Sequence, residues 1–150
     1  MSALAERHCQ LCGVATDAGF FDDSRIVTAP AMGTEVVLAS YQLHPNYCGE
    51  LLYFAQFTDA FAADPKEVRT QGLEWEIRCN GNPRDPYIRF DRIINPWGIS
   101  GFPVHLRLEE GCLTELVVRG TSTTTIGTVG GRLLGRFWYN PIYGFPGAGR

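Results

Sequence analysis

The residues LEWEIRCNG, from Leu73 to Gly81, carry the clearest structural signal in the sequence. Apolar and polar side chains alternate strictly, with Leu73, Trp75, Ile77 and Cys79 on one face and Glu74, Glu76, Arg78 and Asn80 on the other. This alternation is typical of a β-strand with one face on the core and the other in solvent. Cys79 is therefore predicted to be buried, and the glutamates are predicted to lie on the solvent-exposed face. Asn80-Gly81 then predicts a tight hairpin turn.

Short apolar runs between turn signals extend this pattern along the chain. Strands are predicted over residues 25–30, 34–43, 50–59 and 132–140, with a hairpin over 104–120 that turns at Glu109-Glu110-Gly111. Apolar residues on both faces of 50–59 indicate a central strand covered on both sides. Glycines of the run TIGTVGGRLLG are expected to permit close strand packing. Seven or eight short strands without a strong amphipathic helix predict an all-β protein, an antiparallel β-sandwich that is jelly-roll-like.

The 150 residues are enough for one domain with a core. We expect the β-sandwich domain at 26–140, an N-terminal arm at 1–25 that ends in the turn-rich DAGFFDDS, and an irregular C-terminal arm at 141–150. The net charge of −3 offers no broad basic field, so nucleic acid is not an expected partner. A membrane span is not expected either, because no apolar run reaches roughly 18 residues. The start of the sequence has no secretory pattern, which favours synthesis in the cytosol.

Five cysteines raise the question of metal or disulfide chemistry. Cys9 and Cys12 form a C-x-x-C pair, which is half of a zinc site; His44 and Cys48 are the least implausible residues to complete it. The thiols are alternatively able to form a disulfide, either within the set Cys9, Cys12 and Cys48 or to a neighbouring subunit. Unpaired thiols are the default in the cytosol. No metal or other cofactor is predicted.

Catalytic signals are weak. No serine lies in a G-x-S-x-G motif, and His105 is expected to be a solvated residue of a sheet. Glu74 and Glu76 resemble a glycosidase carboxylate pair in spacing, but the wet face of a strand explains them more simply. We therefore predict that the protein is not an enzyme; a hydrolytic site assembled from scattered residues such as Cys48 and His105 is the least favoured alternative.

Aromatic residues in or beside Pro/Gly-rich segments are the remaining candidates. They are predicted to anchor contacts between subunits, where aromatic side chains are enriched: Trp97, Phe102, Trp138, Tyr139, Tyr143 and Phe145. The C-terminal arm is expected to clasp another chain, although a tail folded over its own sandwich fits as well. A carbohydrate-binding β-sandwich module, with Trp97, Trp138 or Tyr139 as a stacking platform, is the alternative.

Three patterns give the chain a resemblance to a protein family. They are W-x-I-x-x-N-G at Trp75 to Gly81, L-x-x-G-x-x-x-E-L-x-V-R at Leu108 to Arg119, and G-x-L-x-G-x-[FW]-W at Gly131 to Trp138. Over roughly residues 35–140 the sequence resembles small β-sandwich structural proteins of tailed bacteriophage virions. The resemblance implies a non-enzymatic virion protein that decorates a capsid or builds a neck, collar or tail. It further implies homo-oligomers that contact other virion proteins after assembly in the host cytoplasm, and it supplies no catalytic residues.

Overall fold

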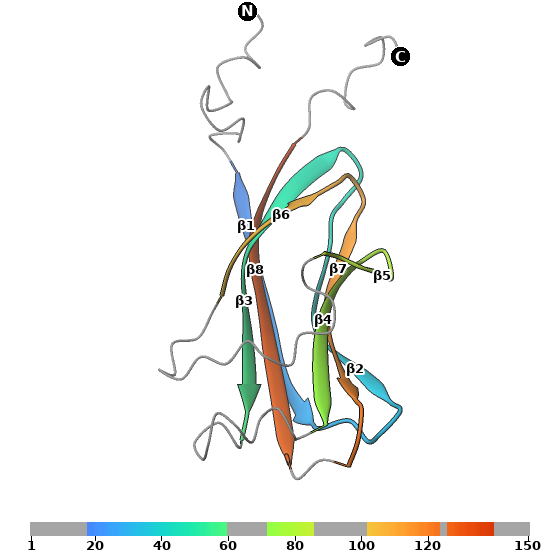
Figure 1. Cartoon of the computed structure of the whole chain (residues 1–150). Helices are drawn as coiled ribbons and strands as arrows, with labels where there is room; N and C mark the ends of the chain where they lie inside the picture. The colour runs from blue at the N-terminus through green and yellow to red at the C-terminus, as the bar shows by residue number, and fades with distance from the viewer. Residues whose placement is uncertain (1–17, 60–71, 86–101, 124–125, 140–150) are drawn as a thin grey trace, which may run out of the picture.

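The computed structural model describes residues 18–59, 72–85, 102–123 and 126–139. They form eight strands: β1 (Gly19–Thr28), β2 (Glu35–Gln42), β3 (Tyr47–Thr58), β4 (Leu73–Cys79), β5 (Asn82–Pro83), β6 (Phe102–Leu108), β7 (Leu113–Gly120) and β8 (Thr128–Tyr139). Two antiparallel sheets, β1-β8-β3-β6 and β2-β7-β4-β5, pack against each other as a sandwich (Figure 1). Over these residues there is no helix long and apolar enough to cross a membrane.

The strand order is that of a jelly roll. β1 pairs with β8, β2 with β7, β3 with β6 and β4 with β5, so the pairs are nested around the turn at Asn80-Gly81. Both turn residues have positive φ, 52° for Asn80 and 78° for Gly81, as a two-residue hairpin turn requires. The predicted all-β sandwich, its jelly-roll character and this hairpin are confirmed.

The hairpin predicted over residues 104–120 is wrong. β6 pairs with β3, whereas β7 lies in the other sheet between β2 and β4. The turn at Glu109-Glu110-Gly111 therefore carries the chain from one sheet to the other. Alternation predicts which face of each strand is buried, and it did so correctly for Val104, Leu108 and Leu116. It does not identify the strand's neighbour, because that choice depends on the whole sheet.

The first strand begins earlier than predicted. Residues 19–25, expected to belong to an arm, form the start of β1 and pair with β8 from Gly19↔Phe137 onward. Asp22 and Asp23 are poor strand formers. Pairing with β8 and burial of Phe21, which is 4% exposed, outweigh that local preference. Residues 1–17 and the predicted C-terminal arm at 141–150 lie outside the described residues.

β3 is a central strand, as predicted, with β8 on one side and β6 on the other. The predicted cover on both faces is not found, since Tyr53 and Phe57 are 46% and 45% exposed. A register shift between Leu51 and Tyr53 in both ladders marks a bulge. The bulge resets the alternation, so that Leu51 and Phe54 both face the core. It explains why apolar residues occur at both odd and even positions.

The core fills the space between the two sheets. Its fully buried side chains come from both layers and include Leu38, Leu51, Phe54, Ile77, Leu116 and Leu133. Trp75 and Cys79 are each 2% exposed, which confirms the predicted core face of β4. Two glycines of β8 permit the close packing that was expected. A Cβ atom at Gly135 would lie 2.2 Å from the Phe21 ring, and one at Gly131 would lie 2.6 Å from Leu116.

Candidate functional site

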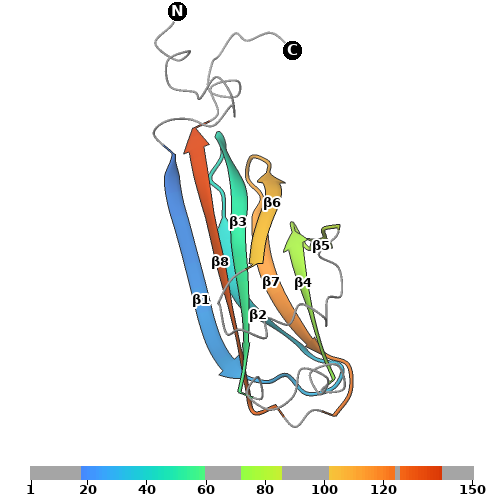
Figure 2. The same ribbon diagram turned by 60° about the vertical axis from the view of Figure 1, so that its left-hand side comes forward.

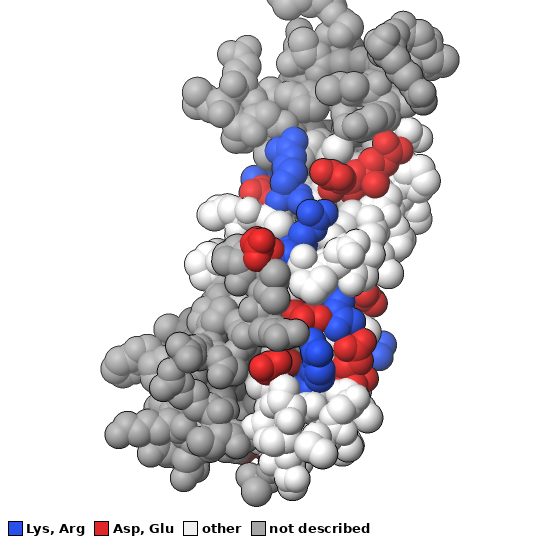
Figure 3. All heavy atoms as spheres, turned by 45° about the vertical axis from the view of Figure 1, so that its right-hand side comes forward, with Lys and Arg blue, Asp and Glu red and all other residues white. Residues whose placement is uncertain are grey.

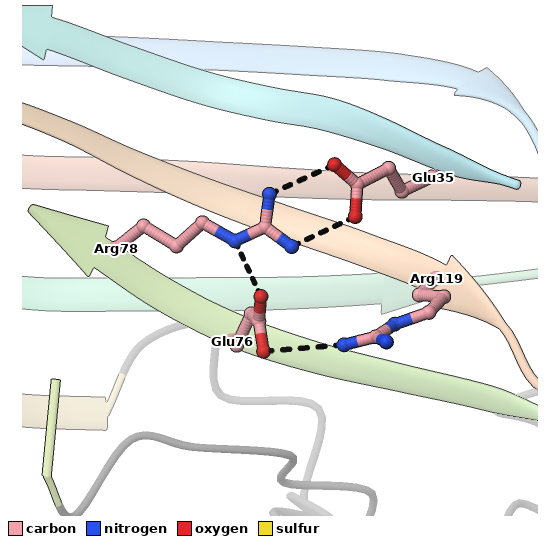
Figure 4. Close-up of polar contacts among 4 residues, drawn as sticks. All are labelled: Glu35, Glu76, Arg78 and Arg119. Carbon is pink, nitrogen blue, oxygen red and sulfur yellow. Dashed lines mark hydrogen bonds and ion pairs between the residues drawn. The ribbon is translucent and has the colours of Figure 1, made fainter. Parts of the chain in front are cut away.

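The outer face of the β2-β7-β4-β5 sheet carries a connected group of four charged side chains, Glu35, Glu76, Arg78 and Arg119 (Figure 4). Arg78 donates two hydrogen bonds to Glu35, at 2.8 and 2.7 Å, and its Nε donates to Glu76. Arg119 Nη2 lies 3.5 Å from the second oxygen of Glu76. The ladders of β7 with β2 and β4 bring these side chains together. Arg119 of β7 lies between Glu35 of β2 and Glu74 of β4, and Glu76 and Arg78 follow Glu74 on the same face of β4.

Electrostatic pairing within the group is strong. The hydrogen bonds from Arg78 lower the pKa of Glu35 below its ordinary value, and the two glutamates raise the pKa of Arg78 further above an already high value. Glu76 is only 5% exposed, so the wet face predicted for this residue is wrong. Both of its oxygens face arginines, which leaves it unsuited to act with Glu74 as a glycosidase pair. The arrangement is suited to stabilising the sheet.

The outer face of the β1-β8-β3-β6 sheet also carries mutually neutralising charges. Arg132 donates to Asp22 at 2.7 Å, Arg136 donates to Glu50 at 2.8 Å, and His105 lies 3.5 Å from Glu50. His105 is 86% exposed, as predicted for a solvated residue. On the side of the molecule that Figure 3 shows, positive and negative side chains of the described residues are likewise interleaved.

Exposed apolar side chains concentrate on the outer face of that same sheet. Phe20 and Ile26 of β1 are 70% and 68% exposed, and Tyr53 and Phe57 of β3 are exposed by nearly half. Within the described residues β1 pairs with β8 alone, and Figure 2 shows it at the margin of the sheet beside β8. A margin strand presents unpaired backbone groups to any strand that approaches it. Together, this margin and its two side chains form what we call the β1 edge.

The other margins are less open. A register shift between Val37 and Ala39 bends β2, and the Ser40 backbone N–H of β2 donates a hydrogen bond at 2.7 Å to Asp23 of β1, which ties these two margins together at that point. β5 has only two residues, and β6 contains Pro103, which donates no backbone hydrogen bond. Bulges, short strands and proline are the usual means of protecting sheet margins. The β1 edge, with ten residues, is the longest regular margin among the described strands.

The aromatic residues predicted as anchors divide into three groups. Trp97, Tyr143 and Phe145 lie outside the described residues, and Phe102 is in β6 but its side chain is not described. Trp138 is 4% exposed, packs with Ala18 and Cys48, and has the Arg107 guanidinium 5.2 Å from its ring centre. It is therefore a buried residue, neither an exposed anchor nor a sugar platform. Tyr139 is 42% exposed and contacts the edge of the Tyr47 ring.

Cys9 and Cys12 also lie outside the described residues, so the unpaired thiols expected by default and the disulfide and zinc alternatives all stay predictions. His44 is exposed in the turn before β3, and Cys48 is half-buried next to Trp138. The described part of the chain contains no group of three or more His, Cys, Asp or Glu side chains placed to hold a metal ion.

The sequence analysis did not single out Phe20, because it assigned residues 1–25 to an arm, and it placed Ile26 in a predicted strand without recognising its exposure. The available signal was the spacing of Phe20, Asp22, Ser24 and Ile26, which places them on one face of an extended segment. The eight strands of the described residues have the topology of a jelly roll. No protein-family model and no curated protein matches the sequence.

Proposed function

We propose that the chain is a non-enzymatic structural protein of a phage virion, a capsid decoration, neck or tail component, and that its copies associate through the β1 edge. The observation that carries the proposal is the ten-residue margin of β1, which among the described residues forms a ladder with β8 alone and carries the exposed side chains of Phe20 and Ile26. An open margin is a template for pairing with a strand of another chain. The charged side chains on the outer faces of both sheets are largely paired with each other, which favours a structural role for these faces.

The sequence of β1 suits pairing with a second copy of itself. In an antiparallel pair of two β1 strands centred on Asp23, Phe20 of each copy lies opposite Ile26 of the other. A single two-fold contact then covers four apolar side chains that are exposed in one copy. The same register places the two Asp23 residues opposite each other, and each is engaged by Ser40 of its own copy.

Sedimentation velocity over a range of concentrations tests the association. Wild type is expected to self-associate, whereas Phe20→Lys/Ile26→Lys stays monomeric with an unchanged β-type circular dichroism spectrum. Tyr53→Lys/Phe57→Lys is the matched control, since it removes two exposed aromatic rings from the same sheet and leaves β1 intact; it is expected to associate like wild type. A monomeric wild type, or association that persists in the β1 variant, argues against the proposal.

The virion assignment needs its own measurement. Peptide mass spectrometry of purified particles is expected to find the chain in many copies per particle if its gene lies among phage capsid and tail genes. A glycan array addresses the alternative of a carbohydrate-binding module. Saturable glycan binding by a monomer, with no copies in the particle, would favour that alternative.

A further inference from the structure

Two thiols meet in the core where β4 ends and β7 begins. Cys79 is the last residue of β4 and lies opposite Thr114, and Cys112 precedes Thr114 by two positions and so faces the same way. The Thr114 hydroxyl lies 4.0 Å from Cys79 Sγ and 3.6 Å from Cys112 Sγ. Both cysteines are thiols and each is 2% exposed. Two thiols from distant parts of the sequence thus gather around one hydroxyl.

We propose that Cys79 and Cys112 form a dithiol site that a peroxide oxidises to an intramolecular disulfide. The bond joins the end of β4 to the connection between β6 and β7, which crosses from one sheet to the other. The site is independent of the proposed virion function and uses none of the cysteines that the sequence suggested.

The environment gives the two thiols different roles. A hydrogen bond from Cys112 lowers the pKa of Cys79, with help from Arg84 and Thr114 against the effect of burial. The same hydrogen bond and burial raise the pKa of Cys112. We assign Cys79 as the attacking thiol, because the Arg84 guanidinium interacts with it and favours its thiolate, the form that attacks oxidants. Cys112 is the second thiol, which resolves the product.

The reaction balances with one peroxide molecule. The Cys79 thiolate attacks a peroxide oxygen, the O–O bond breaks, and Cys79 becomes a sulfenic acid as the released hydroxide takes a proton to form water. Cys112 then loses its proton and attacks Cys79 Sγ; the S–S bond forms, the S–OH bond breaks, and a second water leaves. Two thiols lose two electrons, and the peroxide gains them.

The hairpin beside Cys79 gives the oxidant a short route to the buried sulfur. Asn80 and Gly81 are exposed, β5 has only two residues, and Arg84, which interacts with Cys79, is exposed as well. A short hairpin at the margin of a sheet opens locally more readily than a central strand. Opening there uncovers Cys79 without separating the two sheets.

Peptide mapping tests the proposal in a variant that retains only these two thiols, Cys9→Ser/Cys12→Ser/Cys48→Ser. The folded protein is treated with hydrogen peroxide, alkylated, and digested with trypsin without reduction. Cleavage after Arg78, Arg84, Arg107 and Arg119 gives peptides 79–84 and 108–119. We expect them to be linked, with the loss of two hydrogens, and to separate on reduction. In the same background Cys112→Ser is expected to give no linked peptide and a sulfenic acid at Cys79 that dimedone traps.

Recovery of both cysteines as alkylated thiols, or a sulfinic acid at Cys79 without a linked peptide, overturns the proposal. If the triple variant does not fold, the same digest of wild type decides the question, because bridges that involve Cys9, Cys12 or Cys48 give other peptide pairs. A linked pair of 79–84 and 108–119 in wild type supports the proposal, and its absence after peroxide treatment contradicts it.

Discussion

Glu76 shows how much one side chain can depend on its neighbours in space. Its position in an alternating strand predicts exposure, yet Arg78 and Arg119 lie over it and leave it 5% exposed. A buried carboxylate is tolerated when it is paired and hydrogen-bonded. Arg78 belongs to the same strand, but Arg119 comes from β7, so only the ladder between β4 and β7 completes the site.

The substitution Glu76→Ala is expected to lower the free energy of unfolding by about 2 kcal/mol, because Arg78 and Arg119 each lose a hydrogen-bond acceptor. Arg78 retains its two hydrogen bonds to Glu35, which limits the loss. Urea denaturation followed by circular dichroism measures the change. Glu74→Ala is the matched control on the same face of β4, where a change within about 0.5 kcal/mol is expected. Equal decreases in the free energy of unfolding of the two variants would show that the buried ion pairs of Glu76 add no stability beyond that of an exposed glutamate.

Acid sensitivity is expected from Glu35. Its pKa in the folded protein is lowered from the ordinary value of 4.5, mainly by the hydrogen bonds from Arg78. The unfolded chain therefore takes up the proton first as the pH falls, so this contribution to stability is full above pH 4.5 and is lost as the pH drops through the folded pKa. Because Glu35 is half-exposed, the effect is small and screened by salt.

Thermal unfolding at low ionic strength, followed from about pH 6 to about pH 3, measures that contribution. The Tm of wild type is expected to fall more steeply than that of Glu35→Gln, which has no carboxylate to protonate at this position. Parallel pH profiles of the two proteins would assign the acid sensitivity to other groups.

At the scale of elements, the β4–β5 hairpin is the part that local sequence predicts best. Asn80 and Gly81 have positive φ, and the Asn80 side chain also accepts a hydrogen bond from the Leu113 N–H at 2.9 Å. Glycine adopts positive φ without the steric cost that a Cβ atom brings. Both the turn and the register of β5 follow from this dipeptide.

Gly81→Ala is expected to destabilise the protein by about 1 kcal/mol, because alanine is strained at a φ of 78° while open space surrounds the position. Chemical denaturation measures this cost. Asn82→Ala, at the next and equally exposed position, is the control and should change stability little. A stabilising effect of Gly81→Ala would mean that the turn relaxes to another conformation.

Other elements were predicted in part. The buried faces of β4, β6 and β7 follow from alternation, because a period of two is a local property of extended chain. The start of β1 was missed, since Asp22 and Asp23 resemble a turn until β8 lies beside them. Phe20 lies in the missed part of this strand, so the error about the element became an error about the candidate site. Ile26 lies in the part that was predicted as strand, but its exposure was not recognised.

At the scale of the molecule, oxidation of Cys79 and Cys112 is expected to stabilise the fold. A bridge between residues 79 and 112 closes a loop and so lowers the conformational entropy of the unfolded chain, which raises the free energy of unfolding by about 3–4 kcal/mol. Denaturation of the peroxide-treated protein, with and without reductant, measures the gain, and Cys112→Ser is the control that should show none. A loss of stability on bridging would indicate strain in the folded state.

The C-terminal arm at 141–150 was predicted to contribute to assembly. Its removal is expected to weaken self-association and to leave the β-type circular dichroism spectrum intact, because all eight strands of the described residues lie before residue 140. Sedimentation velocity of the truncated and complete chains measures the first effect. Loss of the β spectrum would show instead that the arm belongs to the fold.

The amino-acid sequence by itself determined the all-β class, the inward faces of β4, β6 and β7 and the turn at Asn80-Gly81, since each depends on a period of two or on the φ of single residues. Only the tertiary structure decided that β6 pairs with β3, that β1 pairs with β8, that Glu76 is buried, and that Cys79 meets Cys112. The physical reason is that these contacts join segments far apart in the chain. Their partners are chosen by closing both sheets over one common core, and no local pattern contains that choice.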